Sequence, residues 1–223
     1  MRAIIKFTKE ENIRYISHLD ILRMFQRAIK RAALPVSYSK GFNPHMIISF
    51  ACALPTGAQS LAEYADVKFD SDIDPVEVLN ALNAVMPRGS RILKVNRLSE
   101  EFPSLMALVN ASDYRIDINE NGADKLISEL VKQTVDAKEI IIDKKTKRGI
   151  KATDIRPMIR DISYHDRAIY CKLDAGNNAN LRPDSLMNYF SQMLECFPEY
   201  TITRTALYIN DGERVMDLAE LGG

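Results

Sequence analysis

The sequence is poor in the residues that build metal and disulfide sites, with three histidines and three cysteines among 223 residues. Cys52, Cys171 and Cys196 are far apart and odd in number, which favours reduced thiols over a disulfide framework. They lack the close spacing that binds an iron–sulfur cluster, and no histidine spacing predicts a metal site. We therefore expect no cofactor and no metal in this chain.

Long apolar runs are also absent, because none reaches the roughly 18 residues that a membrane span needs. Met1–Lys6 enters a strand-like alternation without the apolar stretch of a signal peptide. The phosphate-binding patterns GxxxxGK-S/T and GxGxxG do not occur, which disfavours nucleotide hydrolysis. We expect a soluble, cytoplasmic protein without a membrane partner.

The net charge of the chain is zero, but the charged residues are distributed unevenly along it. Lys plus Arg and Asp plus Glu both number 30, yet residues 1–50 hold nine cations against three acids, and residues 144–160 hold seven against one. Two such segments can present a strong local field to a polyanion. The alternative is that both are solvated surface.

The hydrophobic patterns predict an α+β fold of two tandem ferredoxin-like units, each of the βαββαβ type with an antiparallel sheet. We place the units at residues 1–99 and 112–210, a linker at 100–111 and a tail at 211–223. The predicted helices are 19–33, one starting at Asp74-Pro75, 123–133 and 183–194. The predicted strands are 3–7, 36–39, 46–52, 63–69, 91–95, 114–118, 139–143, 158–163, 168–173 and 200–209.

The first predicted helix has one apolar and one basic side. Leu22, Phe25, Ile29 and Ala32 share one side, and the opposite side carries Arg23, Arg27, Lys30 and Arg31. Four cations would then face the solvent.

A Gly-Phe-Asn-Pro-His turn follows this helix. Lys40 with the flexible Gly41 could cradle a phosphate, while Phe42 could anchor a protein partner or lie buried under the turn. Asn43 and His45 complete a corner typical of functional loops, and His45 could alternatively only fix the turn.

Catalytic candidates are few. His18, with Tyr15 nearby in sequence, could act as a general acid or base, or could belong to a structural network in which Ser17 or Asp20 caps the helix. His45 is the third catalytic candidate.

Further polar residues lie elsewhere along the chain. Glu63 and Asp66 are three apart on one predicted strand and so face opposite sides, which excludes a carboxylate pair. Arg156 precedes Pro157, where a partner would fix its guanidinium. Residues 144–151 read as an exposed basic loop.

Four motifs near the N-terminus occur in a specific order and spacing: Tyr15–Asp20, Gly41–His45 with Ile48–Phe50, Leu54–Gly57 and Glu63–Asp66. In these the chain resembles a domain-of-unknown-function family described as radical SAM-associated or radical SAM-linked. The likeness continues more weakly through Arg156–Ile159 and Arg204–Leu207, and departs at Met46, where relatives often have Pro.

The resemblance implies a radical SAM protein as partner. The iron–sulfur cluster, S-adenosylmethionine and, for a cobalamin-binding partner, cobalamin would then belong to that partner alone. The resemblance does not imply a reaction for this chain.

Three functions remain open. The first is an accessory protein that binds RNA or another anionic substrate and presents it to a radical SAM enzyme. The second is a metal-independent RNA-processing endonuclease, by fold-level analogy alone. The third is a purely protein-docking subunit. The expected substrate-binding residues are Asp20, Arg23, Arg27, Arg31, Lys40, Gly41, Phe42, Asn43, His45, Glu63, Arg156 and Arg204.

Overall fold

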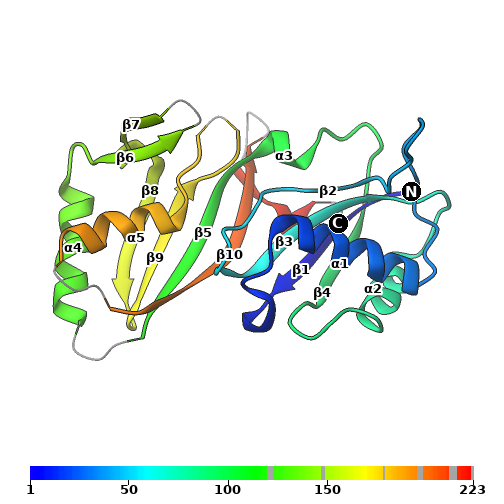
Figure 1. The fold of residues 1–223 in the computed structure, drawn as a ribbon, viewed down its shortest axis with the longest axis horizontal. Helices are drawn as coiled ribbons and strands as arrows, with labels where there is room; N and C mark the ends of the chain where they lie inside the picture. The colour runs from blue at the N-terminus through cyan, green and yellow to red at the C-terminus, as the bar shows by residue number, and fades with distance from the viewer. Residues whose placement is uncertain (120–122, 147–148, 178, 195–197, 211–214, 222–223) are drawn as a thin grey trace. The chain divides into compact units, whose positions relative to one another are not determined.

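A computed structural model describes residues 1–119, 123–146, 149–177, 179–194, 198–210 and 215–221 of the chain. Within them the protein is mixed α/β, with mostly antiparallel strands and five α-helices (Figure 1). None of the helices in this part of the chain has the length and apolar character needed to cross a membrane. Two compact units divide the chain: residues 1–109 with 206–223 form the first, and residues 110–205 form the second.

The first unit is built on three antiparallel strands in the order β4-β1-β3, with the short β2 also paired to β3. Its strands are β1 (Arg2–Lys9), β2 (Ile48–Phe50), β3 (Gln59–Lys68), β4 (Ile92–Leu98) and β11 (Val215–Asp217). Its α-helices are α1 (His18–Arg31), α2 (Pro75–Asn83) and α3 (Leu105–Leu108), and its 3-10 turns are η1 (Glu11–Ile13) and η3 (Leu218–Glu220).

Helix α1 forms where the sequence predicts it, because its apolar residues recur at helical spacing. Ile21, Met24, Phe25, Ala28 and Ile29 are buried and form one stripe. The helix ends at Ala32, and Ala33 follows with a positive φ of 52°. Pro35 comes two residues later, so the chain cannot continue as a helix.

The core of the first unit lies between this stripe and the sheet, and Figure 1 shows α1 lying across β1 and β3. Phe7 of β1 meets Phe25 of α1 edge to face, with ring centroids 4.6 Å apart. Phe50 of β2 completes the group at 5.6 Å from Phe25. Val78 and Leu82 of α2 are fully buried in the same cluster. The sheet face opposite these helices carries the other side chains of each strand.

The second unit has the strand order β10-β5-β9-β8. Its strands are β5 (Val109–Ile118), β6 (Ile141–Thr146), β7 (Gly149–Asp154), β8 (Ile159–His165), β9 (Ala168–Asp174) and β10 (Tyr200–Asn210), whose last residues belong to the first unit. Its helices are α4 (Asp124–Asp136) and α5 (Pro183–Gln192), with the 3-10 turn η2 (Arg156–Met158). The predicted hairpin around residues 164–167 is present, with positive φ at Asp166 and Arg167.

Two local predictions were wrong. Residues 144–151 were expected to be an exposed loop, but Lys144 and Lys151 pair directly across an antiparallel hairpin of β6 and β7. Backbone pairing tolerates solvated lysines, so composition alone did not show these strands. The predicted strand 36–39 is reduced to two isolated bridges, Val36 to Phe69 and Tyr38 to Met46.

Candidate substrate-binding surface of the first unit

The start of α1 is capped by its own side chains. The Asp20 backbone N–H donates to Ser17 Oγ at 3.2 Å, and the Ser17 hydroxyl donates to Asp20 Oδ2 at 2.6 Å. Asp20 Oδ1 accepts from Arg23 at 2.9 Å. The Ser17 hydrogen bond, followed by that of Arg23, lowers the pKa of the Asp20 carboxyl below its usual value. Asp20 is therefore a charged capping residue and remains only partly accessible to a ligand.

The outer face of α1 is basic, as predicted. Its four cations, Arg23, Arg27, Lys30 and Arg31, are all exposed. A hollow of about 370 Å³ runs along this face. Its lining includes three of the arginines and one acid, together with apolar side chains: Ile13, Ile16, Asp20, Arg23, Met24, Arg27, Arg31 and Pro87. Arg31 also donates to the Val85 carbonyl at 3.0 Å, which fixes its guanidinium beside the hollow.

The two catalytic candidates at the start of α1 make separate contacts. His18 is exposed, and its ring meets Phe50 edge to face with centroids 5.2 Å apart. Tyr15 is 68% exposed, and its hydroxyl accepts from Arg14 at 2.9 Å. The Arg14 guanidinium also lies 4.8 Å from the Tyr15 ring centroid. These contacts suit surface packing: His18 contacts an aromatic ring, and the Tyr15 hydroxyl accepts from a guanidinium.

Hydrogen bonds between Ser39 and His45 hold the turn after α1. The Ser39 backbone N–H donates to the His45 carbonyl at 2.8 Å, and the His45 N–H donates to Ser39 Oγ at 3.1 Å. The same hydroxyl lies 2.9 Å from His45 Nδ1. These three contacts join the two sides of the turn, so His45 fixes its shape.

Between these arms the backbone turns sharply. Gly41 has a φ of 135°, which side-chain-bearing residues rarely adopt. Lys40, Phe42 and Asn43 are exposed around it, and Phe42 is 111% exposed. Of the two placements predicted for Phe42, the structure shows the outward one.

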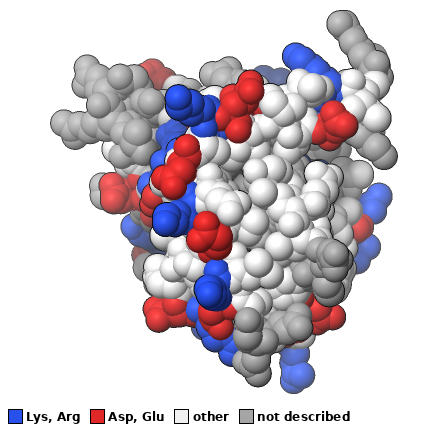
Figure 2. All heavy atoms as spheres, turned by 90° about the vertical axis from the view of Figure 1, so that its left-hand side faces the viewer, with Lys and Arg blue, Asp and Glu red and all other residues white. Residues whose placement is uncertain are grey.

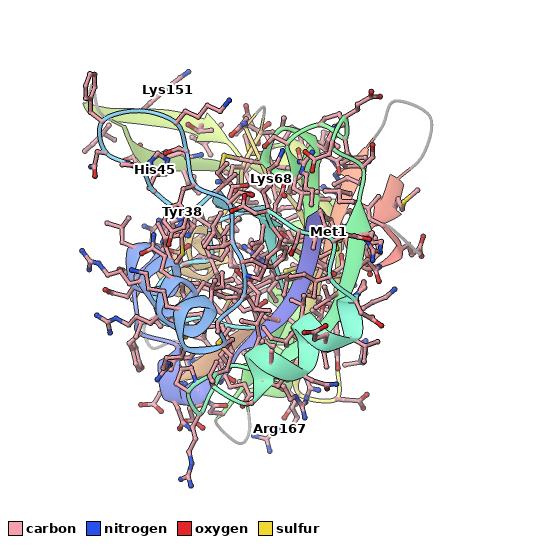
Figure 3. The ribbon with its side chains drawn as sticks, turned by 90° about the vertical axis from the view of Figure 1, so that its right-hand side faces the viewer. Met1, Tyr38, His45, Lys68, Lys151 and Arg167 are labelled. Carbon is pink, nitrogen blue, oxygen red and sulfur yellow. The ribbon has the colours of Figure 1, made fainter. Side chains whose placement is uncertain are left out.

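A second hollow, of about 520 Å³, lies at the foot of the turn. His45 and Ser39 line one part of it, and Figure 3 shows His45 on the projecting loop with Lys68 toward the sheet. Lys68 Nζ pairs with Glu100 at 2.6 Å, and Arg2 pairs with Asp66 at 2.7 Å. Two cations and two acids therefore balance there, so this hollow is not a simple anion site.

Arg2 is fully engaged at this hollow. Besides three bonds to Asp66, its guanidinium donates to four backbone carbonyls, those of Ser99, Glu100, Phe102 and Pro103. The hydrogen bond to Asp66 is the main cause that raises the pKa of Arg2 above its ordinary value. Arg2 consequently fastens residues 99–103 to β1 and has no donor to spare for a ligand.

The strand register explains why the predicted cluster is divided. Glu63 pairs with Phe7, a core residue, and is 7% exposed on the helix-facing side. Asp66 pairs with Ile4, so it faces the opposite side of the sheet, as its spacing predicts. The hollow of His45 includes Asp66 and therefore opens on the face away from α1. The basic helix and the foot of the turn do not form one pocket.

The opposite sheet face is partly covered by the end of the chain. Tyr64 is 2% exposed and donates to Asp217 at 3.4 Å, while Asn96 donates to the Leu221 carbonyl at 2.5 Å. Leu218 is 1% exposed and lies beside Tyr64 and Lys6. Burial, followed by the negative charge of Asp217, raises the pKa of Tyr64 well above its usual value. The aromatic ring of this face is not open to a ligand in this structure.

Two predicted binding residues of the second unit make contacts within the fold. Arg156 donates to the carbonyls of Val135, Ala137 and Ile159, each at 3.1 Å, and so caps the end of α4. Arg204 is fully buried, with its guanidinium 5.8 Å from the Tyr114 ring centroid. Both guanidinium groups are thus engaged within the fold, and their assignment as substrate ligands stays a prediction.

The second basic segment does not form a uniformly basic surface. Lys144 donates to the Asn180 carbonyl at 3.1 Å, and the hollow of about 480 Å³ beside it also contains Asp143 and Asp184. Figure 2, which faces the side where α4 lies in Figure 1, shows Lys and Arg interspersed with Asp and Glu. Residues 147 and 148 lie outside the described residues. No group of three or more His, Cys, Asp or Glu in the described part of the chain is placed to hold a metal.

Residues that the sequence did not point to line the hollow at the foot of the turn. Arg2, Lys68 and Glu100 come from three distant segments, and register pairs Arg2 directly with Lys68. Alternation in β1 could have placed Arg2 on the outer sheet face with Lys6. These residues lie near His45 only because of the strand pairing, which the sequence alone does not predict.

The fold and these surfaces define a mixed α/β protein with a basic helix and an exposed aromatic turn in its first unit. Residues 2–183 match the model of a bacterial family described as "Uncharacterized protein conserved in bacteria (DUF2344)", and the chain belongs to that family. No curated protein matches the sequence. The family description names no radical SAM enzyme, so that part of the resemblance stays a prediction.

Proposed function

We propose that this protein is a cytoplasmic accessory subunit that binds RNA or another anionic substrate through its first unit and presents it to a radical SAM enzyme. The observation that supports it best is the outer face of α1. There Arg23, Arg27 and Arg31 are exposed at one-turn spacing along a hollow of about 370 Å³. Arginines in such a row suit the phosphates of a nucleic-acid backbone.

The sequence around this face strengthens the charge argument. No Asp or Glu occurs between Asp20 and Glu63. The same interval contains the cations Arg23, Arg27, Lys30, Arg31 and Lys40. Glu63 is buried, so the acid that ends this interval does not offset the exposed cations at the surface. A zero net charge therefore coexists with a local positive potential.

The radical SAM partner is proposed from the sequence resemblance and not from the charge of α1. The four motifs from Tyr15 to Asp66 resemble the radical SAM-linked family, and this resemblance is the reason to propose a radical SAM protein as partner. In that arrangement the iron–sulfur cluster, S-adenosylmethionine and any cobalamin belong to the partner. This chain would contribute binding and positioning and no reaction of its own.

The proposal includes a fold of two tandem ferredoxin-like units. In the first unit β1, α1, β2, β3, α2 and β4 follow in the βαββαβ order, with strand order β4-β1-β3 and β2 paired to β3. The second unit repeats this with β5, α4, β8, β9, α5 and β10, in the order β10-β5-β9-β8. The hairpin of β6 and β7 is then an insertion. Both patterns fit a split βαβ unit.

The test measures the affinity for single-stranded RNA as a function of salt. Replacing Arg23, Arg27 and Arg31 together by Gln should weaken binding at least tenfold at low salt and lower the log–log salt slope by about 2. A matched variant replaces three exposed cations of the second unit, Lys125, Lys132 and Lys138, and should leave both quantities nearly unchanged. Thermal unfolding checks that both variants fold.

Three outcomes would contradict the proposal. Wild-type protein that binds no RNA or other polyanion would remove the substrate role. Equal losses in the two triple variants would show that the charge effect is not specific to α1. RNA that is cleaved by the purified wild type would instead favour the endonuclease alternative.

A further inference from the structure

Phe42 is the most exposed large apolar side chain among the described residues, at 111%. A fully solvated phenyl ring contributes nothing to the core of its own unit. Lys40 and Asn43 of the same turn are exposed as well. The ring is therefore presented with both faces available to another molecule.

The frame that carries the ring is fixed. Ser39 and His45 join the two arms by backbone and side-chain hydrogen bonds of 2.8 to 3.1 Å. Tyr38 pairs with Met46 just below them, and Met46 is 5% exposed within the core cluster. A preorganised support lowers the entropic cost of placing an aromatic ring against a ligand.

Three other aromatic side chains of the first unit are less suited to stacking. Tyr15 already carries the Arg14 guanidinium at 4.8 Å from its ring centroid. Tyr38 is 47% exposed and lies in the arm of the turn. Tyr64, on the outer sheet face, is covered near Asp217 and Leu218. Phe42 is the most exposed aromatic ring among the described residues of this unit.

The surroundings favour a nucleobase over an apolar protein pocket. Lys40, two residues before Phe42, and His45, three residues after it, are both exposed, and the chain from residue 21 to 62 has no acid. An aromatic ring among cations is the combination with which proteins hold single-stranded nucleic acid, by stacking on the base and attraction to the phosphate.

We propose that Phe42 stacks on an unpaired base, so that the substrate of this surface is single-stranded RNA or the unpaired loop of a folded RNA. The inference rests on the proposed function and narrows its substrate class. Duplex RNA, whose bases are already stacked, would engage the arginines of α1 but not Phe42.

The experiment uses the full chain and a short single-stranded oligoribonucleotide that carries one fluorescent adenine analogue, with the matching duplex as comparison. Phe42→Ala should weaken binding to the single strand by roughly five- to a hundredfold and leave duplex binding unchanged. Phe42→Tyr should keep the affinity and the fluorescence quenching, while Phe42→Leu should lose the quenching. Val76→Ala, at another exposed apolar side chain of the same unit, is the control and should match the wild type.

The outcomes separate this inference from the function on which it rests. Absence of RNA binding by the wild type would overturn both. RNA binding that depends on α1 but is unchanged in Phe42→Ala would overturn the stacking inference alone. Full affinity in Phe42→Leu would also overturn it, as would a Phe42→Ala variant that binds RNA normally but no longer binds the radical SAM partner.

Discussion

The Arg2–Asp66 pair shows how one residue can organise a distant segment. Both side chains are mostly buried, at 14% and 10% exposure. The Arg2 guanidinium then uses its remaining donors on the backbone of residues 99–103. Its planar fork with five donors is suited to this role, which a lysine could not fill.

We expect Arg2→Met to lower the free energy of unfolding by about 3 kcal/mol, because it leaves the Asp66 carboxylate buried without its partner. Denaturant unfolding measures this loss. The control is Arg97→Met, which breaks the exposed pair between Arg97 and Asp72 and should change the midpoint little. Similar losses in both variants would show that the burial of the Arg2 pair has no energetic consequence.

At the scale of elements, the end of α1 stores a small strain. Ala33 adopts a φ of 52°, while the Leu34 N–H donates to the Ile29 carbonyl at 3.2 Å and closes the last turn. Glycine usually occupies this position, because a Cβ is unfavourable in the left-handed region.

Ala33→Gly should therefore stabilise the protein by up to about 1 kcal/mol in thermal or denaturant unfolding. Ala32→Gly is the matched control, since Ala32 has a helical φ of −75° and glycine there should cost about 0.5 to 1 kcal/mol. If both substitutions destabilised equally, the left-handed turn would not limit the stability of α1.

At the scale of the whole molecule, the first unit is discontinuous in sequence. Residues 206–223 belong with residues 1–109, and the segment with Asp217, Leu218 and Leu221 lies over the sheet face that carries Tyr64. The sequence predicted residues 211–223 as a tail, and its described part, from residue 215, contains β11 and a buried leucine pair.

Leu218→Ala should lower the free energy of unfolding by roughly 2 to 4 kcal/mol, because Leu218 is 1% exposed and its truncation opens a cavity. Equilibrium unfolding followed by tyrosine fluorescence measures it. Met216→Ala, two residues earlier in the same segment but only partly buried, should cost less. A loss below that of Met216→Ala would show that the segment does not stabilise the first unit.

The sequence by itself determined most of the secondary structure and the surface character of α1. The apolar stripe of α1 and the capping residues Ser17 and Asp74 are local patterns, so they predicted these helices correctly. The exposed arginines of α1 followed from the same periodicity.

Only the tertiary structure decided which of these residues meet. Strand register joined Arg2 with Lys68 and placed both with His45 around one hollow. The fold also engages Arg156, which donates to backbone carbonyls from a 3-10 turn, and Arg204, which is buried beside an aromatic ring. The reason is physical: periodicity fixes the face on which a side chain lies, whereas long-range pairing fixes what lies opposite that face.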